Sequence, residues 1–406
     1  MISRLVSRCR PGDRESGQAS MVTVAMFMML FAAIAVSFTF VVISASRQAL
    51  NDSLQSSAKI AAESGVEDAK RLIVYCYNKR QSDGSYPPAD KPLCSEVIGK
   101  LSDELEGRGC DKILKPMYDK GGISDVEEEG GRGYRVKVGN NSGGKNENNE
   151  YYQCLKIATK TDNYQGVVNN LGKSVIVPLR VVDKNNNAAV IASLEIEWHR
   201  NVAGNDGDNP AKMNGAMGTG LPPAGTWNSG NSNRPAVLRV ERVDVAKGSF
   251  TLDSLADSDT ALTLRPSVNG NGGGKDKNRY HLGDYKPYYQ SGRDSIAPNN
   301  QYGGKAPIVE AKCDGADYAC KTIFEDSLDT TKTDYYLRIN AIYRSTHFKI
   351  TAYGQNGKKL YFDGVQPLVD VTGRSSDSFS RIQARLKPSF DKNADSTNWW
   401  PEYVID

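Results

Sequence analysis

The sequence is poor in the residues that most metal and catalytic centres use. Its 406 residues include only 3 His, and its 7 Cys form no CxxC pair. It also has no Walker A loop and no GxSxG motif, and its histidines (His199, His281 and His347) stand far apart. Zinc centres take clustered Cys and His ligands, and P-loop enzymes need the glycine-rich loop. We therefore expect no catalytic residues and no cofactor.

A strong net charge and general hydrophobicity are missing as well. The 51 Lys and Arg residues nearly balance 48 Asp and Glu residues, and a net charge of +3 argues against a globally basic nucleic-acid-binding protein. With 39% hydrophobic residues and a mean hydropathy of −0.52, the chain is too polar to cross a membrane many times. With 20 Tyr it is too aromatic for a disordered chain. These averages indicate a folded protein with one local exception.

The exception is a single long apolar run near the N-terminus. Residues 16–46 contain no charged side chain, and a helix needs about 20 apolar residues to cross a bilayer. Four basic residues precede the run, and mixed charges follow it, so the positive-inside rule predicts a single-pass protein with a cytoplasmic N-terminus. The basic residues are Arg4, Arg8, Arg10 and Arg14. A secretory signal peptide is the alternative interpretation.

The helix is expected to continue beyond the membrane as an amphipathic segment over residues 47–77. Apolar residues recur there every three or four positions, which predicts one buried stripe. No proline lies between Gly17 and Pro87, and Gly65 is the one weak point, at a cost of about 1 kcal/mol. The first half is apolar all round and suits lipid or neighbouring copies, whereas the second half suits a globular head.

This N-terminal region resembles that of the type IV pilins, in particular a class III prepilin of the minor pilin or tip pseudopilin kind. The matching text is a short Arg-bearing leader ending in Glu15-Ser16-Gly17, the apolar helix that follows it, and Ala61-Ala62-Glu63-Ser64-Gly65. The resemblance implies that residues 1–17 form a leader, that a prepilin peptidase cuts between Gly17 and Gln18, and that Gln18 is methylated.

Two positions depart from the major pilins. Those have Phe and Glu at the first and fifth mature positions, where this chain has Gln18 and Val22. The family's glutamate helps to seat an incoming subunit by pairing with a neighbour's N-terminal amine, which valine cannot do. The departure favours a minor or tip subunit over a bulk subunit.

The resemblance implies a structural subunit that is held in the membrane before it enters a pilus. Its partners would be other pilin subunits, through helix 18–46, together with the prepilin peptidase and the assembly platform. The head would be exposed at the pilus or cell surface for adhesion or DNA capture. One alternative is a single-pass, surface-anchored binding protein that never polymerises. A weaker one is a membrane-anchored secreted enzyme, because a Ser/His/Asp triad can assemble from distant residues.

The cysteines divide according to this topology. Cys9 lies inside the leader, and the six others lie outside the membrane, which suits three disulfides in an oxidising compartment. The short spacing favours a Cys313–Cys320 bond. The sequence does not choose among the pairings of the remaining four, which are Cys76, Cys94, Cys110 and Cys154.

Residues 78–406 are expected to form an α+β head, in which the amphipathic helix covers an antiparallel sheet enlarged by inserted β structure and long loops. Alternating residues predict a strand at 189–199, and a meander of strands at 335–343 and 347–353 continues through a hairpin turn at Asn356-Gly357. We interpret the head as two subdomains, residues 78–250 and 251–406.

Candidate ligand sites lie in two long loops, 200–234 and 266–306. The second carries basic and aromatic residues that suit a surface glycan or single-stranded DNA; with Trp227 they form a candidate set of Arg279, Tyr280, Tyr285, Tyr288, Tyr289 and Trp227. Scattered surface residues are the favoured reading of this set. Closely spaced carboxylates are weak calcium candidates, against a favoured reading as solvated acidic loops. They are Asp206, Asp208, Asp253, Asp257 and Asp259.

Overall fold

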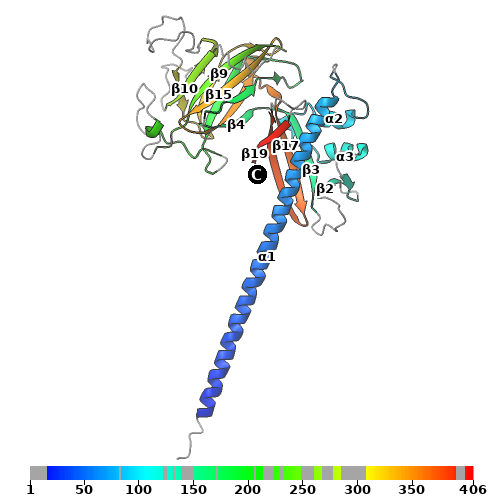
Figure 1. Cartoon of the computed structure of the whole chain (residues 1–406), viewed down its shortest axis with the longest axis vertical. Helices are drawn as coiled ribbons and strands as arrows, with labels where there is room; N and C mark the ends of the chain where they lie inside the picture. The colour runs from blue at the N-terminus through cyan, green and yellow to red at the C-terminus, as the bar shows by residue number, and fades with distance from the viewer. Residues whose placement is uncertain are drawn as a thin grey trace, which may run out of the picture.

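The protein consists of a long N-terminal helix and a β-rich head (Figure 1). This confirms the predicted α+β class with a helix packed on an antiparallel sheet. The computed structural model describes residues 16–81, 84–121, 126–130, 133–138, 150–170, 172–204, 207–213, 224–227, 232–247, 260–267, 278–284, 308–389 and 398–405.

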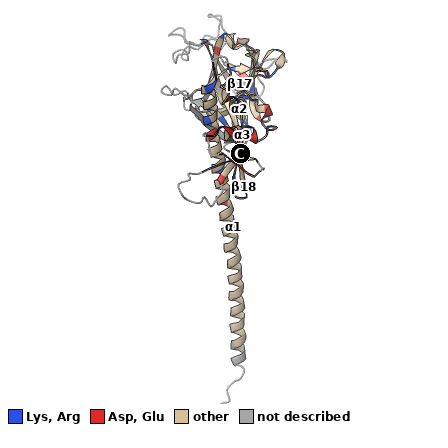
Figure 2. Cartoon of the chain, turned by 90° about the vertical axis from the view of Figure 1, so that its right-hand side faces the viewer, with Lys and Arg blue, Asp and Glu red and all other residues tan. Residues whose placement is uncertain are grey.

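Helix α1 runs without a break from Ser16 to Lys79, 64 residues that span roughly 95 Å. Its N-terminal half projects from the head and carries no Lys, Arg, Asp or Glu between residues 21 and 46 (Figure 2). Ala58 is the first buried side chain, and from there one stripe of the helix packs on the head. The continuous helix with two unlike halves is therefore confirmed.

The first sheet carries the docked half of α1. Its strand order is β1-β2-β3-β17-β18-β19, with β6 paired to β17, and every pairing is antiparallel. The bounds are β1 Val126–Glu128, β2 Tyr134–Lys137, β3 Glu150–Thr161, β6 Val181–Val182, β17 Tyr361–Ser375, β18 Ser378–Ser389 and β19 Asn398–Ile405. Helix α1 lies against β3, β17 and β18 (Figure 1).

The first sheet and the docked half of α1 form the first lobe of the head, and the second sheet forms the second lobe. Three short helical segments complete the first lobe. They are α2 (Lys91–Val97), the 3-10 turn η1 (Ser102–Glu104) and α3 (Asp111–Lys120). The apolar residues of α2 and α3 join the strands and α1 in one core cluster. Fully buried members of the cluster include Leu72, Leu93, Leu114, Val371 and Ile382.

The second sheet has ten strands in the order β4-β16-β8-β13-β12-β10-β9-β15-β5, with β11 paired to β13. The bounds are β4 Tyr164–Val168, β5 Val175–Pro178, β8 Ser193–Arg200, β9 Val237–Ala246, β10 Thr260–Ser267, β11 Arg279–Tyr280, β12 Ile308–Cys313, β13 Tyr318–Phe324, β15 Thr333–Ile342 and β16 Thr346–Tyr353. Smaller elements are β7 (Val190–Ile191) with β14 (Leu328–Asp329), and the turns η2 (Ala224–Thr226), η4 (Leu282–Asp284) and η6 (Gln355–Gly357).

This second sheet curls over on itself. β15 ends at Ile342 and β16 begins at Thr346, yet the two strands lie near opposite ends of the strand order. A connection of three residues can join them only if the two ends of the sheet come together. Leu337 of β15 and Phe348 of β16 accordingly share one core cluster with Trp198.

The meander predicted for residues 335–353 is therefore wrong. β15 pairs with β9 and β5, whereas β16 pairs with β8 and β4. Strand alternation indicates which face is buried, but it does not identify the partner strand. The turn at Asn356-Gly357 does form, with φ values of 61° and 68°, after which β17 leaves for the first sheet.

The two lobes are nested rather than consecutive. β3 and β17 are neighbours in the first sheet, with Lys160 opposite Asp363 and Thr161 opposite Phe362. All strands of the second sheet lie between them in sequence. A boundary at residue 250 would separate β9 from β10, which pair in one sheet, so the sheets divide the head differently from the 78–250 and 251–406 interpretation.

Candidate functional site

The projecting half of α1 is the largest exposed apolar surface among the described residues. Large side chains along it are half or more exposed, including Met26 (71%), Phe31 (67%) and Phe40 (71%). The helix is long and apolar enough to cross a membrane. Soluble monomers rarely expose a contiguous surface of this kind, so it indicates a lipid or protein environment.

Two glycines allow α1 to approach the first sheet closely. A Cβ on Gly65 would lie 2.5 Å from Cγ1 of Val371, and a Cβ on Gly373 would lie 2.1 Å from the carbonyl oxygen of Ala58. Gly65 is therefore more than a weak point of the helix, because a larger residue would separate the helix from β17.

Polar contacts then fix the helix at its C-terminal end. The hydroxyl of Tyr152 donates to Asp68 at 2.8 Å, and the hydroxyl of Tyr75 donates to Asp90 at 2.6 Å. Lys120 at the end of α3 also donates to Asp90, so one buried carboxylate links α1 and α3 at the start of α2.

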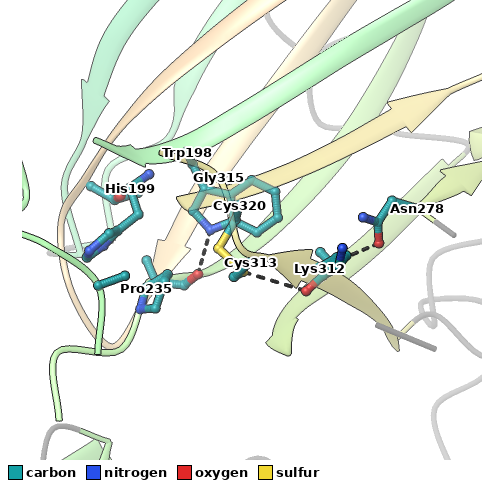
Figure 3. Close-up of a disulfide and its surroundings, with 12 residues drawn as sticks. Trp198, His199, Pro235, Asn278, Lys312, Cys313, Gly315 and Cys320 are labelled. Carbon is teal, nitrogen blue, oxygen red and sulfur yellow. Dashed lines mark hydrogen bonds between the residues drawn. A yellow bond between two sulfur atoms is a disulfide. The ribbon is translucent and has the colours of Figure 1, made fainter. Parts of the chain in front are cut away.

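The six cysteines that follow the apolar run in sequence form three disulfides. They are Cys76–Cys94, Cys110–Cys154 and Cys313–Cys320. The first joins α1 to α2, and the second joins the start of α3 to β3. The third is the local pairing that the sequence favoured, and it links directly opposed residues of β12 and β13 beside Trp198 (Figure 3).

Gly17 and Gln18 lie in the first turn of α1, and their side chains are outside what the structure describes. Cleavage between these residues stays a prediction. Cys9 lies outside the described residues.

Asp208 is the centre of a buried polar cluster at one end of the second sheet. Its Oδ2 accepts hydrogen bonds from the amide of Arg200 (3.0 Å), the hydroxyl of Thr346 (2.8 Å) and the amide of His347 (2.9 Å). Its Oδ1 lies 3.0 Å from Nδ1 of His347. We call Asp208, Thr346, His347 and His199 the Asp208 clasp, because it fastens the segment at 207–213 to β8 and β16.

The clasp uses the carboxylate of Asp208 for internal hydrogen bonds. Burial acts to raise the pKa of this carboxyl, but the hydrogen bonds from His347 and Thr346 outweigh that effect and lower the pKa. Within the described residues, no group of three or more His, Cys, Asp or Glu is placed to hold a metal ion. The other calcium candidates, Asp206, Asp253, Asp257 and Asp259, lie outside the described residues.

In the sequence, His199 and His347 fall on the polar faces of predicted strands, which predicts that both lie at the surface. For His199 this prediction is wrong. This side chain is fully buried; its Nε2 lies 3.0 Å from the carbonyl oxygen of Asn209, and its Nδ1 has no partner among the described residues. His199 is the last residue but one of β8 and has φ at 64°, so its side chain leaves the alternation on which the surface prediction rested. Burial lowers the pKa of His199 to about 4, against an opposing effect from Asp208.

We expect the head to lose stability as the pH falls from about 6.5 towards 4. His199 stays neutral in the folded protein but binds a proton more readily when unfolded, so acid favours the unfolded state. A shift of this size corresponds to a loss on the order of 3 kcal/mol. Chemical denaturation across this pH range measures it.

The matched control is His281→Gln, which removes an exposed histidine. His199→Asn should flatten the pH dependence above pH 4, whereas His281→Gln should leave it unchanged. Equal slopes in the wild type and His199→Asn would contradict the prediction. The contribution of Asp208 falls in a separate window, below about pH 4, because its pKa is lowered.

Trp227 is not available as a ligand contact, contrary to the sequence prediction. It is 1% exposed, its ring stacks on Tyr343 with centroids 4.4 Å apart, and its Nε1 donates to the carbonyl oxygen of Pro235. The described parts of loop 200–234 are thus held to the sheet by Trp227 and the Asp208 clasp. Neither contact could be predicted from the sequence, because Trp227 and Asp208 lie within a long polar stretch.

The structure places two members of the basic and aromatic set. Tyr280 packs against the core of the second sheet and donates to the carbonyl oxygen of Glu310 at 2.7 Å, and Arg279 pairs with Glu325. Both residues form β11 at the side of β13. Tyr285, Tyr288 and Tyr289 lie outside the described residues, so their role as ligand contacts stays a prediction.

No family model, curated protein or solved structure matches this chain. The comparison with type IV pilins therefore rests on the architecture alone: a long N-terminal apolar helix followed by a β-rich head against which its second half packs.

Proposed function

We propose that this protein is a minor pilin subunit, membrane-inserted before assembly and then part of a type IV pilus. The observation that carries the proposal is the division of α1 at Ala58 into an exposed apolar half and a half docked on an antiparallel sheet. Such a helix suits two environments in turn, first lipid and then the helices of neighbouring subunits.

In this proposal the helix provides both anchoring and assembly. Before assembly, residues 18–46 cross the bilayer with the N-terminus in the cytoplasm, where a prepilin peptidase removes residues 1–17. The assembly platform then extracts the subunit, and helix contacts replace lipid contacts. Val22 offers no carboxylate to a neighbour's N-terminal amine, which supports a tip or minor position. The head is exposed for adhesion or DNA capture and is assigned no catalytic reaction.

Mass spectrometry of the mature N-terminus tests the proposal. We expect the mature chain to begin at N-methylated Gln18, and Gly17→Val to leave an unprocessed chain beginning at Met1, because the larger side chain blocks the peptidase. Ser16→Ala is the matched control and should still be processed. An intact N-terminus in the wild type would instead favour the non-polymerising surface anchor.

A further inference from the structure

A groove of about 690 Å³ lies on the face of the first sheet that α1 does not cover. Its floor includes Lys156 of β3, Asp370 of β17 and Arg381 of β18. These alternate along the strands with residues such as Leu155 and Val371, which belong to the core beneath α1. The groove therefore opens on the side of the sheet opposite the helix.

On the floor of the groove, the guanidinium group of Arg381 is held in a fixed orientation and is about half exposed. Arg381 donates from Nε to Oδ1 of Asp370 at 2.8 Å and from Nη2 to Oδ2. Asp370 is 3% exposed, whereas the side chain of Arg381 is 51% exposed. The buried carboxylate orients the planar guanidinium, whose remaining surface is accessible to solvent.

The walls supply acceptors. Glu106 and Asp111 are exposed, and Oδ1 of Asp111 accepts a hydrogen bond of 3.4 Å from the backbone amide of Tyr134. Glu129 also lines the groove and is 3.3 Å from Arg135. With Asp370 these carboxylates outnumber the two cations of the floor, so the groove disfavours a polyanion such as DNA.

The walls are held to the floor covalently. The Cys110–Cys154 disulfide joins the start of α3 to β3 directly in the lining. Tyr134 of β2 also borders the groove and packs on Tyr118 of α3, with ring centroids 5.3 Å apart. A site whose walls are fixed in this way loses little conformational entropy when a ligand binds.

Size and chemistry together indicate the ligand class. The volume lies in the range of roughly 300–1,000 Å³ found for small-ligand sites, but those are mainly apolar, whereas this lining alternates charged donors and acceptors. Sugar hydroxyls both donate and accept, and so pair with carboxylates and guanidinium groups alike. We propose that the groove binds a neutral or amine-bearing oligosaccharide. This deepens the proposed function, on which it rests for its setting, by naming the ligand class of the exposed head.

The test uses the full chain in detergent, with its disulfides intact. Binding of short chitosan and chitin oligosaccharides is measured by calorimetry, with heparin and duplex DNA as polyanionic probes. We expect binding of chitosan and chitin oligosaccharides and none of the polyanions. Glu106→Gln combined with Asp111→Asn should weaken binding by at least about tenfold, because charge-assisted hydrogen bonds are lost.

The control pair is Asp314→Asn with Asp317→Asn, two exposed carboxylates of the second lobe, which should bind like the wild type. No oligosaccharide binding, equal affinity of the groove and control variants, or a preference for heparin or DNA would overturn the inference. Processing at Gln18 is read separately: a processed chain that binds no sugar removes only this inference, and an unprocessed chain that binds sugar removes only the proposed function.

Discussion

Replacing Gly373 with alanine should lower the free energy of unfolding by about 3 kcal/mol, because it forces α1 away from β17. The added methyl would lie 2.1 Å from the carbonyl oxygen of Ala58 and 2.4 Å from the amide nitrogen of Ala62. Both are backbone atoms of the helix, which cannot rotate aside as a side chain can. Denaturant unfolding of the full chain in detergent measures the loss.

Gly225→Ala is the matched control for this substitution. A Cβ at Gly225 meets no atom within 4 Å, and its backbone is outside the left-handed region. We expect a change within about 0.5 kcal/mol for the control. If Gly373→Ala unfolds at the same denaturant concentration as Gly225→Ala, the close approach of helix and strand is not needed for stability.

Removing the Cys110–Cys154 disulfide should cost more stability than removing Cys313–Cys320. The first closes a sequence separation of 44 residues and the second a separation of only 7. The chain-entropy account predicts losses on the order of 4 kcal/mol and 2.5 kcal/mol, because the longer loop gains more freedom when it unfolds.

Both cysteines of each pair are changed to alanine, so that no free thiol remains to form a wrong bond. Unfolding of the two double variants is compared under the same non-reducing conditions. An equal loss in both, or a larger loss for the Cys313–Cys320 variant, would show that local native contacts rather than loop closure determine the contribution.

The long helix could be predicted because its signals are local. An uncharged run followed by apolar residues every three or four positions specifies both halves of α1 without reference to the rest of the chain. The Cys313–Cys320 bond was favoured for the same reason, since its two residues are close in sequence.

The arrangement of strands could not be predicted in this way. Alternation at 335–343 and at 347–353 identified two strands with buried faces, but their partners are distant in sequence: Ile339 pairs with Val240 of β9, and Ile350 with Ile196 of β8. Adjacent strands usually pair, and here the curled sheet overrides that tendency. The nesting of one lobe inside the other depends on the same long-range pairing.

The sequence could not reveal the contacts of candidate residues whose side chains are held by residues distant in sequence. Trp227 is buried because Tyr343 stacks on it, and Asp208 is engaged because His347 and Thr346 point at it. These partners are more than a hundred positions away in sequence. The groove on the first sheet was not predicted, because four strands and a disulfide assemble its lining from residues 106 to 381.

The second lobe is inserted between two neighbouring strands of the first sheet, so it can vary as a unit. All strands of the second sheet lie between Thr161 of β3 and Phe362 of β17, which face each other across adjacent strands, and the short strand β6 within the insert pairs with β17. Directly opposed strand residues lie about 5 Å apart, so an insert of any size with closely spaced ends fits this junction without disturbing strand register. The surface of the inserted lobe can therefore vary while α1 and the strands of the first sheet outside the insert stay unchanged.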